Sequence, residues 1–261
     1  MDYTIVYKTY KNDLLWLKYS LLSIKKYIID LPEILIYYHI DCKLELESIL
    51  SEFDLNIRII PVEYDIHGYL KQMVIKCMCF EDINTDYIMI MDCDVIFKNN
   101  FSPTNIINDN GCINWYILKR NDLNKNDDVW AVWENSIINM IGEKMDTYYM
   151  YNGFPFLFKR ETLINAHKMF IKKHNIDYNE FCKKHLNIND ILVSDELTGI
   201  NGKFPIISKI FEEFEYLGWY AFNYTKDYSF IEGYNFLDRN QYWSHGGITN
   251  DIETEIRKYL E

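Results

Sequence analysis

The sequence predicts an α/β protein in which helices flank a mostly parallel β-sheet on both faces. Over the first hundred residues, short apolar runs typical of strands alternate with segments in which apolar residues recur at helical spacing. Hydrophobic residues make up 49% of the 261 residues and charged ones 25%, which is the balance of a globular protein. Strands separated by helices pair in parallel, because each helix carries the chain back across the sheet before the next strand begins.

The first half is expected to alternate between strands and helices. The predicted strands are Asp2 to Tyr10, Glu33 to Ile40, Asn56 to Val62 and Asp86 to Met91. The predicted helices between them are Asn12 to Ile28, Lys43 to Phe53 and Tyr69 to Glu81, with Asn12 as a candidate N-cap. Ligands of such sheets bind beyond the carboxyl ends of the strands, so residues that follow a strand are the first candidates for a site.

The pattern is looser after Phe97. Strands are expected at Cys112 to Leu118 and Gly153 to Phe158, and β structure across the aromatic, glycine-punctuated segment Phe214 to Phe236. Helices are expected at Val129 to Ile141, Glu161 to His174 and Asn250 to Leu260, with a polar loop at Lys119 to Asp128. No linker rich in proline, glycine or serine separates the halves. We therefore expect residues 1–261 to form one domain whose second half extends the same sheet.

The net charge of −12, from 27 basic and 39 acidic side chains, argues against nucleic acid as a partner. A protein this acidic would bind an anionic ligand most easily through a divalent cation. The six cysteines lack paired CxxC spacing and are expected to be buried free thiols. With no apolar run of about 18 residues and no signal-peptide pattern, we expect a soluble, cytoplasmic protein without a transmembrane segment.

The stretch YIMIMDCDVIF, Tyr87 to Phe97, places Asp92 and Asp94 one residue apart at the end of a predicted strand. Two carboxylates in this position can aim at one point, and Mn²⁺ and Mg²⁺ prefer such oxygen ligands. A cation held there could bridge the protein to a diphosphate. The alternatives are a strand end that carries aspartates by chance and an aspartate-nucleophile phosphatase. The phosphatase motif normally ends the first strand, whereas three strand–helix units precede this pair.

Together with these aspartates, the segment HGYLKQMVIKC, His67 to Cys77, resembles the GT-A-fold glycosyltransferases that use nucleotide sugars. It is similar to small polysaccharide-building members from bacteria and large DNA viruses. The resemblance covers about Tyr3 to Phe101 and implies a GT-A-like, Rossmann-like fold. It further implies that residues 1–101 bind a UDP- or GDP-type sugar donor, and that residues 102–261 bind a glycan acceptor and close the fold. The activity implied is a metal-dependent sugar transfer with Mn²⁺ or Mg²⁺ as the cofactor. We expect it to invert the configuration, and the alternative, if neither Asp195 nor Glu196 lies near the donor, is a retaining mechanism.

By this resemblance, residues at the ends of the first and fourth strands contact the donor. Thr9 and Tyr10 are candidates for contact with the nucleotide base, and the alternative is that they only begin the first connection. Asp92 and Asp94 would hold the metal on the diphosphate. Cys93, between them in the donor site, is expected to be a spacer whose side chain points away from the ligand.

The helix that precedes the aspartates supplies further candidates for the donor site. Gly68 and Tyr69 open it, while Gln72 and Lys76 are four residues apart and so share one face. A lysine and a glutamine on one face could hold a sugar hydroxyl or a diphosphate oxygen. The alternative is an ordinary solvated helix face.

Late segments are expected to complete the site. His245 in WSHGGI could return to the metal through a ring nitrogen, or be an ordinary turn histidine. An inverting transferase needs a general base near the acceptor hydroxyl, and Asp195 or Glu196 in VSDELTGING could supply it. The same two acids would also suit a helix N-terminus. For the acceptor we expect contacts from Asn152, Gly153 and Trp243.

Two other functions fit parts of the pattern. A nucleotidyltransferase shares the half-fold and the metal chemistry, but its glycine-rich loop is replaced after the first strand by KTYKND, Lys8 to Asp13. A catalytically inactive glycan-binding protein could keep the same fold.

Overall fold

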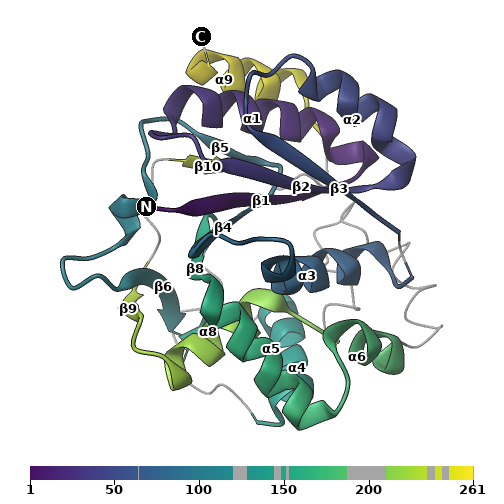
Figure 1. The fold of residues 1–261 in the computed structure, drawn as a ribbon, viewed down its shortest axis with the longest axis vertical. Helices are drawn as coiled ribbons and strands as arrows, with labels where there is room; N and C mark the ends of the chain where they lie inside the picture. Colours follow the sequence, from purple (N-terminus) through teal and green to yellow (C-terminus); the bar gives the residue numbers. More distant parts are fainter. Residues whose placement is uncertain are drawn as a thin grey trace.

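A computed structural model of the chain confirms an α/β architecture with a predominantly parallel sheet flanked by helices (Figure 1). The structure describes residues 1–63, 65–119, 128–143, 148–150, 153–186, 210–233, 239–242 and 247–260, with backbone only at 128–134 and 239–240. The main sheet has the strand order β3-β2-β1-β4-β8, in which β8 alone runs antiparallel to its neighbour. Its strands are β1 (Tyr3–Thr9), β2 (Glu33–His39), β3 (Ile57–Val62), β4 (Tyr87–Met91) and β8 (Phe156–Lys159).

The helices form layers on the two sides of this sheet (Figure 1). One layer contains α1 (Leu14–Tyr27), α2 (Lys43–Leu50) and α9 (Asn250–Leu260). The other contains α3 (Gly68–Met78), α4 (Asp128–Ile141), α5 (Arg160–His174), α6 (Tyr178–His185) and α8 (Glu213–Tyr224). Short 3₁₀ helices are η1 (Lys11–Asp13), η2 (Ile40–Cys42), η3 (Cys79–Glu81) and η4 (Pro103–Ile106). Within the described residues, no helix is long and apolar enough to cross a membrane.

The strand order creates a switch point between β1 and β4. The chain proceeds outward from β1 through β2 to β3 and then returns to place β4 on the other side of β1. The helix α1, which follows β1, and the helix α3, which precedes β4, lie on opposite sides of the sheet (Figure 1). Open α/β sheets bind ligands in the crevice beyond the carboxyl ends of strands at such a point. The fold therefore directs attention to the residues that follow Thr9 and Met91.

The strands on either side of this point are buried, as their apolar sequences predict. All seven residues of β1 are buried, and so are the last four of β4. Parallel strands covered on both faces are typically such continuous apolar runs. The Tyr7 hydroxyl is 2.6 Å from the Ser20 hydroxyl, which donates to the Val95 carbonyl at 2.7 Å. These bonds tie α1 to the chain just after the end of β4.

Among the described residues of the second half, β8 alone joins the main sheet, so the expectation of one continuous sheet is confirmed in part. Strands β6 (Ile113–Lys119), β7 (Tyr148–Tyr149) and β9 (Tyr228–Glu232) form a separate sheet, with β6 in the middle. Strands β5 (Val95–Phe97) and β10 (Arg239–Gln241) form an antiparallel pair.

Two sequence-based predictions are wrong in their local structure. The first half of Phe214 to Phe236 is the helix α8, and only Tyr228–Glu232 within that segment is a described strand. Its aromatic residues favour β structure in general, but Phe214, Leu217 and Ala221 are buried at helical spacing. Asn12 is also not the cap of α1, because it lies inside η1 and Asp13 occupies the N-cap position.

The C-terminal helix packs against α1 (Figure 1). The Tyr19 hydroxyl donates to the Glu253 carboxylate, and the Tyr27 hydroxyl and the Lys26 ammonium donate to the Tyr259 carbonyl. Just before α9, the ring of Tyr242 stacks on Trp16 of α1. The end of the chain is thereby fixed to the helix that follows β1.

Gly218 provides a test of the packing between α8 and the second sheet. A Cβ at this position would lie 2.4 Å from Cβ of Met150 and 2.9 Å from Cζ2 of Trp115. Alanine is the better helix former by about 1 kcal/mol, yet Gly218→Ala should lower the free energy of unfolding by about 1–3 kcal/mol because of the overlap. Urea unfolding measures the change. The matched control is Asn223→Ala at an exposed position of the same helix, which should change the free energy of unfolding by less than about 0.5 kcal/mol. A Gly218→Ala variant that is more stable than the wild type would contradict the close packing of α8 on Met150 and Trp115.

Candidate functional site

Asp92 and Asp94 lie in the turn between β4 and β5, at the switch point. The Val95 amide donates to the Asp92 carbonyl at 3.2 Å, and the Tyr242 amide donates to the Asp94 carbonyl at 3.1 Å. The Asp92 side chain is 24% exposed, whereas Asp94 is buried. The pair therefore stands at the carboxyl end of β4 with one carboxylate open to solvent and the turn held by the C-terminal segment.

Lys76 of α3 reaches this pair. Its Nζ lies 2.8 Å from Oδ1 of Asp92 and 3.0 Å from Oε1 of Glu213, and its side chain is buried. Burial alone would lower the pKa of Lys76, but the charges of Asp92 and Glu213 raise it well above its usual range. The interpretation of Lys76 as part of a solvated helix face is therefore wrong. It is a buried cation that joins α3, the end of β4 and the start of α8.

Two aromatic rings enclose the Lys76 ammonium. Its Nζ lies 5.0 Å from the ring centroid of Phe154 and 5.2 Å from that of Phe214. These two rings meet edge to face, with centroids 5.2 Å apart. Cations are attracted to the faces of such rings within about 6 Å, and the attraction is stronger where water is excluded. The aromatic contacts hold the ammonium against the carboxylates.

Three buried glutamates surround the N-terminus of α8: Glu212, Glu213 and Glu215. Glu212 is the N-cap residue, and its carboxylate accepts from the Glu215 amide at 2.5 Å. Glu215 accepts from the Met150 amide at 2.9 Å. Burial raises the pKa of the Glu213 carboxyl, while the Lys76 ammonium opposes that rise. The positive end of the helix dipole favours carboxylates at this position.

A second buried lysine, Lys8, lies at the end of β1. Burial lowers the pKa of Lys8 to about 8, although the charges of Asp13 and Asp92 act in the opposite direction. Its Nζ is 4.8 Å from the centroid of the Tyr10 ring. The Cys93 thiol donates to the Lys8 carbonyl at 3.4 Å. Cys93 is thus buried against β1.

The other donor-site candidates lie at the end of β1 and on α3. Thr9 is buried and its hydroxyl donates to the Tyr10 carbonyl at 3.4 Å, whereas Tyr10 is 37% exposed. Gly68 begins α3, and the Tyr69 amide donates to Nδ1 of His67 at 3.2 Å. Gln72 is half-buried, one turn before Lys76.

Several predicted site residues lie outside the described part of the chain. These are the two candidate bases, the candidate metal histidine and two acceptor-site residues, namely Asp195, Glu196, His245, Asn152 and Trp243. Gly153 is described, and its φ of +84° is one that glycine adopts without strain. Among the described residues, no group of three or more histidines, cysteines, aspartates and glutamates is arranged to hold a metal ion.

Sequence analysis missed Glu213 and Lys8 as members of the site. Glu213 directly precedes the segment Phe214 to Phe236 that was predicted to be β, although the acids of FEEFE, Phe211 to Glu215, are the pattern of a helix start. Lys8 stands one residue before the end of β1, where an isolated lysine within an apolar strand is the available signal.

A sequence profile of the family of unknown function DUF6492 matches residues 25–203. The chain belongs to DUF6492. Among solved structures, this DUF6492 protein is similar to the crystal structure of S. aureus TarS 1–349, with 18% sequence identity and a TM-score of 0.30. The similarity covers 37% of this chain and 28% of that chain, so it says nothing about activity. No curated protein matches the sequence of this DUF6492 member.

Removal of the Lys76 ammonium should strongly destabilise the protein. Lys76→Met leaves the Asp92 and Glu213 carboxylates without their shared cation, and loss of one partner from a buried ion pair costs about 3–5 kcal/mol. The double variant Lys76→Met/Glu213→Gln should recover part of the loss, because it removes one unpaired charge. Urea unfolding at neutral pH measures both variants.

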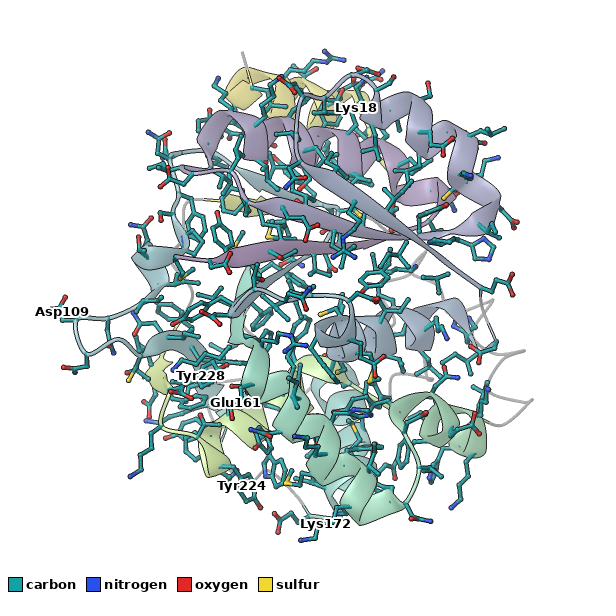
Figure 2. The ribbon with its side chains drawn as sticks, viewed as in Figure 1. Lys18, Asp109, Glu161, Lys172, Tyr224 and Tyr228 are labelled. Atoms are coloured by element: carbon teal, nitrogen blue, oxygen red, sulfur yellow. The ribbon has the colours of Figure 1, made fainter. Side chains whose placement is uncertain are left out.

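The matched control for this experiment is Lys18→Met on α1 (Figure 2). Lys18 forms a 2.6 Å ion pair with Glu52 at the protein surface, so its loss should cost less than about 1 kcal/mol. An equal loss in the Lys18 and Lys76 variants would show that the buried network contributes nothing specific.

Lys8 should make the stability depend on pH. The pKa of Lys8 is about 8 in the folded protein and 10.5, the ordinary value, in the unfolded chain. At a pH between these two values, the folded protein therefore binds fewer protons at Lys8 than the unfolded chain does. Stability should therefore rise by about 1–2 kcal/mol between about pH 7.5 and 9.5. Urea unfolding in chelator-treated buffer measures this rise, which Lys8→Met should lose and Lys18→Met should keep. A rise that survives Lys8→Met would have to come from another group.

Proposed function

We propose that this DUF6492 protein is a metal-dependent glycosyltransferase. It would move a sugar from a nucleoside-diphosphate donor of the UDP or GDP type to a hydroxyl of a glycan acceptor. The observation that carries the proposal is the pair Asp92 and Asp94 at the switch point between β1 and β4, with the buried Lys76 bound to Asp92. Carboxylates and ammonium groups at that point suit a ligand that combines phosphate groups with a divalent cation.

The oxygen ligands that the two aspartates offer fit a hard cation such as Mn²⁺ or Mg²⁺. Asp92 is partly exposed although its Oδ1 faces Lys76, and Asp94 follows two residues later in the same turn. His245 would be the third protein ligand. It follows Tyr242 by three residues, a span of at most about 11 Å, and the Tyr242 amide is bonded to the Asp94 carbonyl. When bound, the cation would supply positive charge to the diphosphate as it leaves.

Two lysines place ammonium groups at this site in an otherwise acidic protein. The chain carries a net charge of −12, which repels an anionic ligand at long range. Lys76 and Lys8 place positive charge at the ends of α3 and β1, next to the aspartates. In our proposal Lys8 attracts the diphosphate oxygens, while Lys76 holds the Asp92 carboxylate in place.

The remaining sequence-predicted residues complete the proposal. Thr9 and Tyr10 would contact the nucleotide, while Gly68, Tyr69 and Gln72 would contact the sugar or the diphosphate. Asp195 or Glu196 would accept the proton of the acceptor hydroxyl. As that oxygen bonds to the anomeric carbon, the bond from the same carbon to the diphosphate breaks and the configuration inverts. Asn152, Gly153 and Trp243 would hold the acceptor.

Asp92→Asn and Asp94→Asn test the metal site. Each substitution keeps the shape of the side chain and removes a charged oxygen ligand, so Mn²⁺-dependent hydrolysis of a nucleotide sugar should fall at least about 100-fold. The thermal shift caused by UDP or GDP with Mn²⁺ should disappear as well. Asp109→Asn, in an exposed loop (Figure 2), is the matched control and should behave as wild type. Circular dichroism checks that each variant is folded.

Other outcomes would replace the proposal. Unchanged donor hydrolysis in a folded Asp92→Asn or Asp94→Asn variant would exclude the pair as the metal site. Thermal shifts with nucleoside triphosphates alone would indicate a nucleotidyltransferase. Shifts with glycans alone would indicate a binding protein.

A further inference from the structure

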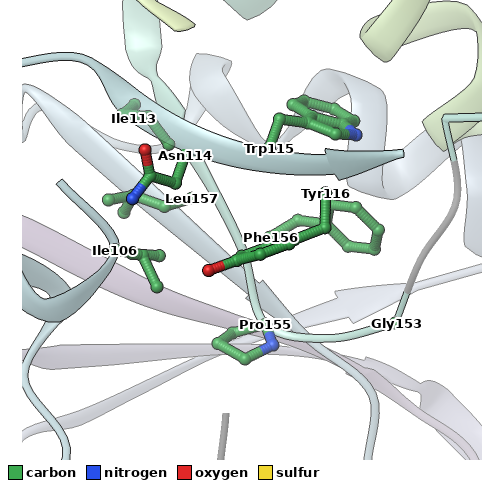
Figure 3. Close-up of a pocket in the computed structure, with 9 residues that line it drawn as sticks. All are labelled: Ile106, Ile113, Asn114, Trp115, Tyr116, Gly153, Pro155, Phe156 and Leu157. Atoms are coloured by element: carbon green, nitrogen blue, oxygen red, sulfur yellow. The ribbon is translucent and has the colours of Figure 1, made fainter. Parts of the chain in front are cut away.

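Two pockets in the described part of the structure differ in the size of the molecule that they can hold. The pocket between β6 and the chain before β8 (Figure 3) has a volume of about 20 Å³, which is room for about one water molecule. The pocket between α4, α5 and α8, which we call the three-helix pocket, has a volume of about 220 Å³. Since an apolar cavity of about 150 Å³ binds benzene, the three-helix pocket has room for an organic group of roughly nine carbon atoms.

Buried apolar side chains form the floor of the three-helix pocket. Met140 of α4, Phe170 of α5 and Tyr216 of α8 line it and are buried. The Tyr216 hydroxyl donates to the Ala166 carbonyl at 2.8 Å, so this polar group already has its partner. Aromatic rings and methionine side chains pack well on flat or irregular apolar groups. The floor therefore suits the aromatic or aliphatic body of a ligand.

Two further rings of α8 lead from this floor to the solvent. The Trp219 ring stacks on Tyr216 with centroids 6.1 Å apart, and it meets the Tyr224 ring edge to face at 5.4 Å. Trp219 is half-buried, and Tyr224 is 58% exposed. Figure 2 shows Tyr224 and Lys172 at the end of the molecule that lies away from the main sheet. At a rise of about 1.5 Å per residue, Tyr224 lies about 16 Å along α8 from Glu213, so the pocket opens away from the aspartate site.

The mouth of the pocket carries one cation. Among the residues that line the pocket, Lys173 of α5 is the one base and Glu143 the one acid, and both are exposed. The Lys173 ammonium donates to the Ile141 carbonyl at the end of α4. Because an ammonium group has three N–H donors, others are left for a ligand. One lysine balances one negative charge, which favours a carboxylate over a phosphate dianion.

The surroundings of the mouth favour an anion over a cation. The last turns of α5 and α6 are both basic. Burial lowers the pKa of His174, the last residue of α5, and its neighbours Lys173, His185 and Lys184 lower it further by their charge. The electrostatic field at this end of α5 is therefore positive, although the net charge of the protein is −12.

From these observations we infer that the three-helix pocket binds a small organic carboxylate, with its apolar body between the three helices and its carboxylate on the Lys173 ammonium. This inference does not rest on the proposed function, because the residues that line the pocket are separate from those of the aspartate site. In the competing arrangement, the four rings and Glu143 would hold an organic cation. The two arrangements predict opposite preferences for the charge of the ligand.

The test uses four small probes in the absence of nucleotide and metal. They are phenylacetate, its uncharged isostere phenylacetamide, the cation 2-phenylethylammonium, and acetate. Saturation-transfer NMR and calorimetry should show that phenylacetate binds at millimolar concentration or below. Phenylacetamide should bind about 3- to 10-fold more weakly because it lacks the charge that pairs with Lys173. The cation should bind more weakly still, and acetate, which has no apolar body, should not bind.

Substitutions separate the charge at the mouth from the space inside. Lys173→Met should lower the affinity for phenylacetate about 3- to 10-fold and leave that for phenylacetamide unchanged, whereas Lys173→Arg should keep the preference for the anion. Met169→Trp, at a half-buried position in the wall, should fill the pocket and abolish binding of both probes. The matched control is Lys172→Met, at the adjacent exposed lysine outside the lining (Figure 2), which should change the affinity by less than about 2-fold.

Thermal unfolding shows whether each variant is folded, and the Lys173 variants provide the test if Met169→Trp is not. Failure of phenylacetate to bind at millimolar concentration would overturn the inference. Equal affinities for phenylacetate and phenylacetamide, or tighter binding of 2-phenylethylammonium, would overturn it as well. Binding of phenylacetate that persists in a folded Met169→Trp variant would show that the probe binds elsewhere and would reject the pocket.

Discussion

The shared ion pair of Lys76 with Asp92 and Glu213 is the interaction on which the arrangement of the site depends. A buried charge costs several kcal/mol unless a partner is supplied, so Lys76 and Glu213 can be buried because they pair with each other and with the partly exposed Asp92. They come from α3, the end of β4 and the start of α8, which are far apart in the sequence. One lysine therefore fixes how the second half of the chain meets the first.

The surroundings of this ion pair reinforce that constraint. Phe154 and Phe214 close over the ammonium, and Phe156 stacks on Phe214 from the start of β8. The aspartate turn, the glutamate-rich helix start and the start of β8 thus share one set of aromatic contacts. A change in any of these rings should be felt at all three places, because packed interiors transmit small displacements.

The first half of the fold and the aspartate pair could be predicted from the sequence, because their information is local. Strands β1 to β4 are short apolar runs, and Asp92 and Asp94 follow directly after one of them. The role of Lys76 could be predicted only in part. Its place on the face shared with Gln72 was visible, but its burial depends on Glu213, 137 residues further along the chain. The helix α8 was missed because the aromatic composition of Phe214 to Tyr224 favours strands, although its apolar residues have helical spacing. Lys8 was missed because its burial comes from neighbours on other elements.

The hydrogen bond from the Tyr242 amide to the Asp94 carbonyl has a consequence for synthesis of the protein. The parallel core of β1 to β4 is complete once about ninety residues have left the ribosome, and domains begin to fold as they emerge. The aspartate turn, by contrast, waits for β10 and for the helix that packs on α1, some 150 residues later. In the proposed function, donor binding would therefore require the C-terminal segment as well as the sheet, so a prematurely terminated chain would lack part of the site.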